Sequence, residues 1–205
     1  MAERGRPRGF DRTEALERAM DLFWRETYEG ASLADLTGAM GIAAPSLYAA
    51  FGSKEQLFRE VVEHYANTQD CGIWQTLDEV DDIRSAVEGF LLATADAYST
   101  GETPPGCLIV LGAQHGLDDG SPARRELRER RRDNRRRLAA RFDRAIAEGA
   151  LPGDFPSHDA AAFYLSVQTG MSLLARDGAD RACLRAVAQG AMLGWDHWIE
   201  GALGG

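Results

Sequence analysis

Cysteine and histidine are the residue types here that could act as a nucleophile and its base, and Cys107 and His115 lie within one predicted helix. A helix rises about 1.5 Å per residue, so eight residues separate the two side chains by about 12 Å, beyond the hydrogen bond that thiol activation requires. The histidines show no metal-ligand spacing, and no glycine-rich phosphate loop follows a strand. We therefore predict no enzyme activity, no metal site and no cofactor. The four histidines are His64, His115, His158 and His197.

The composition indicates a water-soluble protein with reduced thiols. Three cysteines, Cys71, Cys107 and Cys183, are an odd number without a CxxC pair, which argues against a disulfide framework. The longest apolar run, residues 107–113, is far shorter than the roughly 20 residues that span a bilayer, and the arginine-rich start lacks the apolar segment of a signal peptide. We expect a cytoplasmic location and no membrane partner.

Positive charge is concentrated in two segments, although the net charge is -9. Arg4, Arg6 and Arg8 precede the first predicted helix, while residues 124–144 carry eleven arginines. Phosphate binding depends on where cations lie, not on their sum. The N-terminal arginines fit the minor groove of A·T-rich DNA, and a solubilising tail is the alternative. The second segment reads mainly as a solvated helix face, with a second anion-binding surface as the less favoured interpretation.

Capping patterns define the first four helices. Asp11 to Glu14 and Ser53 to Gln56 each have the form of a capping box ahead of an apolar stripe. Ser32 caps a short helix that Gly41 ends, and Pro45 lies in the first turn of the next, where its missing N–H costs nothing. The second and third of these helices, joined by residues 40–43, match a helix-turn-helix.

The third helix predicts one buried and one exposed face. Leu47 and Phe51 are four residues apart and face inward, which leaves four side chains toward solvent. A tyrosine beside small residues suits close approach to a DNA groove, although such a hairpin is often only architecture. The four outward residues are Ser46, Tyr48, Ala49 and Ala50.

Residues 30–58, GASLADLTGAMGIAAPSLYAAFGSKEQLF, resemble the DNA-binding segment of the TetR family of regulators. The resemblance is strong over residues 10–65 and rests elsewhere on helix number and total size. It places Tyr48 on the family's tyrosine and Lys54 on a lysine that contacts phosphate, while Ala50 departs from a frequent histidine. The expected DNA contacts are Arg4, Arg6, Arg8, Ser32, Ala44, Pro45, Ser46, Tyr48, Ala49 and Lys54.

The remaining chain predicts longer helices over residues 81–99, 107–116, 122–148, 157–176 and 180–201. The fold class is therefore all-α, with about nine helices. We expect a flexible basic arm (1–9), a three-helix helix-turn-helix DNA-binding domain (10–55) and a larger helical ligand-binding and dimerisation domain (56–205). Helix 54–70 connects the two domains.

The resemblance implies that the second domain holds an effector and a dimer interface. We assign the interface to small and apolar residues of the last two long helices, although either stripe could be core. These are Phe163, Val167, Gly170, Met171, Leu174, Gly190, Gly194 and Trp198. We place the cavity on the inward faces of the central helices. Its candidates are Phe90, Cys107, Leu111, His115, Phe142, Tyr164 and Gln168.

The resemblance implies a one-component transcriptional regulator, most simply a repressor that binds a palindromic operator as a homodimer and is released by a small molecule. A transcriptional activator is one alternative. Another is a thiol-based redox or electrophile sensor using Cys107, because some TetR members have a cysteine in a comparable place. An inert buried cysteine is the simpler reading of Cys107.

Overall fold

The structure, a computed structural model, describes residues 10–69, 71–101, 103–113 and 120–203. Over these ranges the chain is helical and contains no strand, which confirms the predicted all-α class. None of the helices in this part of the chain is long and apolar enough to cross a membrane. The helices are α1 (Arg12–Gly30), α2 (Leu33–Met40), α3 (Ala44–Phe51), α4 (Lys54–Thr68), α5 (Cys71–Glu79), α6 (Ile83–Tyr98), α7 (Leu108–Leu111), α8 (Pro122–Ala147), α9 (Ser157–Arg176), α10 (Arg181–Met192) and α11 (Trp195–Leu203).

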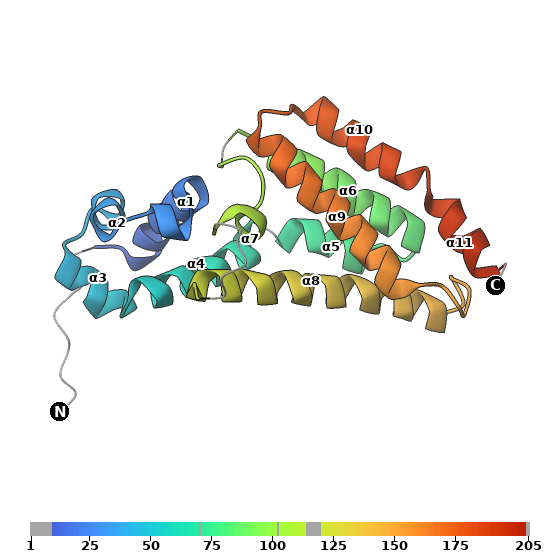
Figure 1. Ribbon diagram of the computed structural model, residues 1–205, viewed down its shortest axis with the longest axis horizontal. Helices are drawn as coiled ribbons and strands as arrows, with labels where there is room; N and C mark the ends of the chain where they lie inside the picture. Colours follow the sequence, from blue (N-terminus) through green and yellow to red (C-terminus); the bar gives the residue numbers. More distant parts are fainter. Residues whose placement is uncertain (1–9, 70, 102, 114–119, 204–205) are drawn as a thin grey trace.

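The first four helices begin where the sequence supplies caps. Asp11 accepts hydrogen bonds from the backbone N–H groups of Thr13 and Glu14, and Ser53 accepts one from Gln56. Ser32 and Asp35 form a reciprocal capping box at α2. Apolar side chains of α1 to α4 close around a common core, so α1 to α3 form a small bundle at one end of the molecule (Figure 1).

The second half differs from the sequence prediction in three places. Helix α5 was not predicted, and the helix expected over residues 107–116 is only the single turn α7 within the described residues. The helix expected over 180–201 divides at Leu193 and Gly194 into α10 and α11. With α5 and this division, the described residues contain eleven helices instead of about nine.

Helices α6, α9 and α10 pack together above α8, which lies parallel to the long axis of the molecule and contacts α4 (Figure 1). The ring of Phe142 in α8 lies 5.3 Å from that of Phe155 and 6.3 Å from that of Tyr164, measured between centroids. Trp195 at the start of α11 joins the same cluster, with centroid distances of 6.2 to 6.4 Å. Aromatic burial of this kind fixes how α8, α9 and α11 pack.

Arg141 shows that the arginine-rich helix is more than a solvated face. Its side chain is buried and donates hydrogen bonds to the carbonyls of Leu77, Val80 and Asp81, which follow or end α5. Burial lowers the pKa of this guanidinium, which still remains charged. One arginine of α8 therefore caps α5, a role that the charge run did not reveal.

The two halves of the molecule are joined by hydrogen bonds at the end of α1. Helix α1 is interrupted at Thr27, whose φ of 64° lies in the region that favours glycine. The next backbone N–H, of Tyr28, donates to the carbonyl of Gly112 at 2.8 Å, just beyond α7. Glu29 accepts a hydrogen bond from Ser121 at the start of α8. The break thus turns α1 toward the second half of the chain.

Candidate DNA-reading surface and effector cavity

The helix-turn-helix is built as the sequence predicts. Gly41 adopts φ 67°, a left-handed conformation that costs glycine little, and turns the chain between α2 and α3. Leu36 and Met40 of α2 and Leu47 and Phe51 of α3 are buried. This packing fixes the outward face of α3.

The predicted DNA contacts of α2 and α3 lie mostly on the surface. Tyr48 is 47% exposed, an unusual position for a large ring, and Ala49 beside it is exposed. Ala44 and Pro45 are exposed at the start of α3, and Ser46 is half-buried. The structure therefore leaves an aromatic side chain and small residues together on one helix face. Ser32 is exposed at the start of α2.

Ala50 corrects the predicted face. It is half-buried and packs against the core, and its carbonyl accepts a hydrogen bond from Arg12 at 3.2 Å. Arg12 also pairs with Glu60 at 2.6 Å and lies 4.4 Å over the ring of Phe51. Arg12 therefore ties α1, α3 and α4 together, whereas the sequence showed only one more cation near the N-terminus.

Lys54 is held by the junction between the two halves. Its ammonium lies 4.4 Å from the ring centroid of Tyr28, and burial lowers its pKa while Glu29 raises it. A lysine stacked on a ring keeps its charge close to the surface of the first domain. Its predicted contact with a phosphate stays a prediction.

Three cations of α1 and α4 form ion pairs with carboxylates of the same two helices. Arg18 pairs with Glu14 at 2.5 Å and Arg59 with Glu55 at 2.7 Å, in addition to the Arg12–Glu60 pair. The arm residues Arg4, Arg6 and Arg8 lie outside the described residues. Their contact with phosphate stays a prediction.

The predicted effector residues do not all come together. Phe90, Phe142 and Tyr164 are buried in ring contacts with Trp74, Phe155 and Trp195, so they are core residues of this conformation. Burial raises the pKa of Tyr164 to about 12. Leu111 is half-buried in α7, and His115 lies outside the described residues.

Cys107 and Gln168 do line one small space, which we name the inner cavity. It has a volume of about 50 Å³. Gln168 donates a hydrogen bond to Thr94 at 3.2 Å, which fixes α9 against α6. The residues around the inner cavity are Cys107, Ile109, Val110, Arg131, Asn134, Leu165, Gln168 and Thr169.

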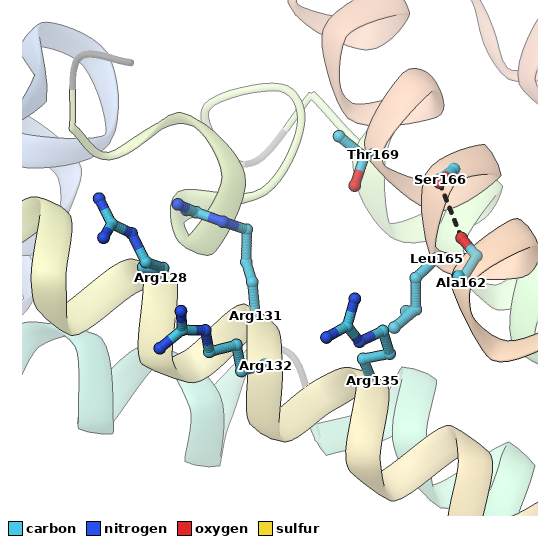
Figure 2. A pocket seen from close by; sticks show the side chains of 8 residues that line it. All are labelled: Arg128, Arg131, Arg132, Arg135, Ala162, Leu165, Ser166 and Thr169. Carbon is cyan, nitrogen blue, oxygen red and sulfur yellow. Dashed lines mark hydrogen bonds between the residues drawn. The ribbon is translucent and has the colours of Figure 1, made fainter. Parts of the chain in front are cut away.

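The inner cavity adjoins a larger depression, the arginine groove, with a volume of about 470 Å³ (Figure 2). Arg131, Leu165 and Thr169 belong to both spaces. Arg131 donates a hydrogen bond to the carbonyl of Ile109 at 2.7 Å. The groove is formed by Arg128, Arg131, Arg132 and Arg135 of α8 and by Ala162, Leu165, Ser166 and Thr169 of α9. The sequence showed the arginines but not the wall opposite them.

Cys107 is placed by contacts from α4 and α9. Gly106, with φ 85°, passes so close to α9 that a side chain there would meet the Ser172 carbonyl, and the N–H of Cys107 donates to Ser172 Oγ at 2.8 Å. Tyr65 donates its hydroxyl proton to the Cys107 sulfur at 3.3 Å. Only 4% of Cys107 is exposed. A buried thiol does not favour a redox or electrophile sensor at Cys107.

Apolar surface remains on α9 and α10. Phe163 and Leu174, two predicted interface residues, are each 39% exposed, and Leu193 is 88% exposed. Gly190 and Gly194 are exposed, while Val167, Gly170 and Trp198 are half-buried. Met171 is fully buried within its own chain and offers no surface to a partner, which corrects its assignment. On a helix, Met171 faces the core that Gln168 and Ala175 also face.

Residues 15–61 match the family described as bacterial regulatory proteins, tetR family. The HTH-type transcriptional repressor ComR of Escherichia coli (strain K12) is 33% identical over 201 residues, 96% of this chain and 94% of ComR. The repressor BdcR of the same strain is 34% identical over 108 residues, 53% of this chain and 55% of BdcR.

Solved structures match this chain over most of its length. A cysteine mutant of the TetR family transcriptional regulator CifR, complexed with 26 bp of double-strand operator DNA, is 44% identical with a TM-score of 0.88. The match covers 93% of this chain and 100% of that one. A TetR regulator from Rhodococcus sp. RHA1 is 34% identical with a TM-score of 0.58, covering 89% of this chain and 97% of that one. The chain contains the helix-turn-helix, is 33% identical to a repressor over 96% of its length and resembles these solved structures. It therefore belongs to the tetR family of bacterial regulatory proteins.

Proposed function

We propose that this protein is a transcriptional repressor that binds a palindromic operator as a homodimer and is released by a small-molecule effector. The observation that carries the proposal is the exposed face of α3, with Tyr48 at its centre, on a fold that matches an operator-bound CifR over 93% of the chain. Tyr48 and the neighbouring small residues would enter the major groove.

The junction between the halves supports release by an effector. Helix α7 contacts Arg131 through the Ile109 carbonyl, and the chain just beyond it contacts Tyr28 through the Gly112 carbonyl. Arg176 of α9 also donates to the carbonyl of Trp24 in α1 at 2.7 Å. A molecule that enters beside α7 would therefore shift α1 and change the spacing of two α3 helices.

The operator is tested by footprinting on DNA upstream of the protein's own gene. We expect a protected, two-fold symmetric site with half-sites about 34 Å apart. Absence of saturable protection would contradict the proposal. Repeating the footprint with a metabolite panel then tests release.

Tyr48→Ala tests the recognition face. We expect unchanged folding, because an exposed residue adds little to the core. We expect operator affinity to fall about tenfold or more, because the ring would be lost from the DNA interface. Tyr48→Phe is the matched control, since it keeps the ring and removes only the hydroxyl. Equal operator affinity for wild type and Tyr48→Ala would remove α3 from the interface.

A further inference from the structure

We propose that the arginine groove and the inner cavity together bind a small organic carboxylate, whose charged head lies on the arginines and whose short apolar end enters the inner cavity. This inference rests on the proposed function, because it names the chemical class of the effector.

The charge of the arginine groove carries the first step. Its described lining contains four guanidinium groups and no carboxylate, in a protein whose net charge is -9. Arg132 donates a hydrogen bond to the Glu129 carboxylate at 3.2 Å, but Glu129 does not line the groove. Arg131 and Arg135, on which the proposal rests, are two like charges on one wall, and an anion between them relieves their repulsion.

The position of the individual side chains carries the second step. Arg135 points into the gap between α8 and α9, and Arg131 runs toward α7 (Figure 2). Burial lowers the pKa of Arg131, Cys107 raises it and Arg128 lowers it, with a net downward shift, so a negative partner beside this guanidinium would stabilise its charged form. Thr169 adds a hydroxyl on the opposite wall. A planar carboxylate can take two parallel hydrogen bonds from one guanidinium.

The apolar walls of the inner cavity are the reason to infer an organic ligand. Ile109, Val110 and Leu165 give it apolar walls, and its volume of about 50 Å³ admits only the end of a short chain. Each methylene that enters would raise affinity by up to about fourfold. Because Arg131 lines both spaces, head and tail of one molecule can be held at once.

The same geometry explains how binding would reach α1. A carboxylate on Arg131 competes with the Ile109 carbonyl for the guanidinium, which loosens α7 from α8. The chain after α7 holds the Tyr28 N–H, so this movement acts on the end of α1.

The test is calorimetric titration of the full-length, DNA-free protein with sodium hexanoate, 1-hexanol and sodium phosphate at constant ionic strength. We expect hexanoate to bind about tenfold or more tightly than either other probe. Arg135→Gln and Arg131→Gln should each weaken hexanoate about tenfold, while Arg144→Gln, an exposed arginine at the far end of α8, should not. Arg135 is exposed, so its variant tests the site even if Arg131→Gln fails to fold.

Equal binding of hexanoate and hexanol, or equal binding by wild type and Arg135→Gln, overturns the proposal. Phosphate that binds as tightly as hexanoate overturns the organic part. If Arg135→Gln instead weakens operator binding or changes the oligomeric state, the groove holds DNA phosphate or a partner's carboxylate, and the proposal is wrong. Operator binding of the wild type, measured in parallel, separates the two proposals. If the protein binds its operator but does not bind hexanoate, only this inference is wrong. Absence of operator binding removes the proposed function.

Discussion

Thr27 is a single residue on which the connection between the two halves depends. Its φ of 64° and ψ of 166° lie where β-branched residues are strained, at a cost of about 1 to 3 kcal/mol. The backbone turn at Thr27 brings the Tyr28 N–H to the Gly112 carbonyl and the Glu29 carboxylate to the Ser121 hydroxyl. The backbone at residue 27 therefore stores energy that the contacts across the junction offset.

Thr27→Gly should raise the free energy of unfolding by about 1 kcal/mol, because glycine adopts this conformation without strain and loses only some backbone entropy. Urea denaturation at neutral pH measures the change. Thr27→Ala is the control, since it also removes the hydroxyl yet keeps the strained φ, and it should not stabilise. If both variants change stability equally, the backbone is not the cause.

Cys183 should react with a thiol-alkylating reagent faster than Cys107 in the folded protein. Cys183 is exposed, whereas Cys107 is buried at the start of α7 and accepts a hydrogen bond from Tyr65. Peptide mass mapping after timed labelling gives the two rates, and labelling in denaturant is the control for reagent access. A faster reaction at Cys107 would reopen the thiol-sensor alternative.

Ion pairs connect elements that the sequence leaves unrelated. Asp96 near the end of α6 accepts hydrogen bonds from Arg181 at 2.7 Å and Arg185 at 3.0 Å, both of α10. The hydrogen bond from Arg181 lowers the pKa of Asp96 below its ordinary value of 3.8, and burial opposes the shift. A carboxylate with a depressed folded-state pKa stabilises the fold above its unfolded pKa.

Asp96→Asn should lower the free energy of unfolding at pH 7 by about 1 kcal/mol or less, because the pair is partly exposed and screened by solvent. The difference from wild type should persist down to the unfolded pKa, near 4, and shrink as the pH falls through the lower pKa of the folded state. Denaturant titrations from pH 7 to pH 3 measure it. Asp154→Asn, in an exposed loop, is the control. A difference independent of pH would show that the charge of Asp96 is not involved.

Large apolar side chains of the second half of the molecule are exposed to solvent. Phe163, Leu174 and Leu193 are exposed on or just after α9 and α10, where the sequence predicts the dimer interface. Phe163 and Leu174 are eleven residues apart and therefore share a face of α9, and exposed apolar side chains that gather on one face mark an interaction site. Two copies joined here would hold their α3 helices at a defined spacing.

Leu193→Glu should weaken the dimer while leaving the protomer folded, because a side chain that is 88% exposed adds little to its own core. Sedimentation equilibrium over a concentration series measures the shift, for which about tenfold weaker association is expected. Asn67→Glu adds the same charge on an exposed position of α4 and should have no effect. Unchanged association for Leu193→Glu would move the interface elsewhere.

The sequence by itself determined the elements whose causes are local. Each of these causes acts within a few residues: the caps at Asp11, Ser32 and Ser53, the turn at Gly41, and Pro45 in the first turn of α3. The helix-turn-helix and its exposed Tyr48 could therefore be predicted. Helix α5 escaped prediction because its nine residues are too few to show a clear helical period.

Only the tertiary structure decided which side chains meet. Arg131, Arg135 and Arg141 belong to one charge run, yet Arg141 caps α5, Arg131 holds α7 and Arg135 faces α9, because a different element packs beside each of them. Cys107 meets Ser172 across 65 positions of the sequence, and Ser121 meets Glu29 across 92. Residue type and helical spacing assign a side chain to a face of its own helix, but the partner on that face is set by packing between distant segments.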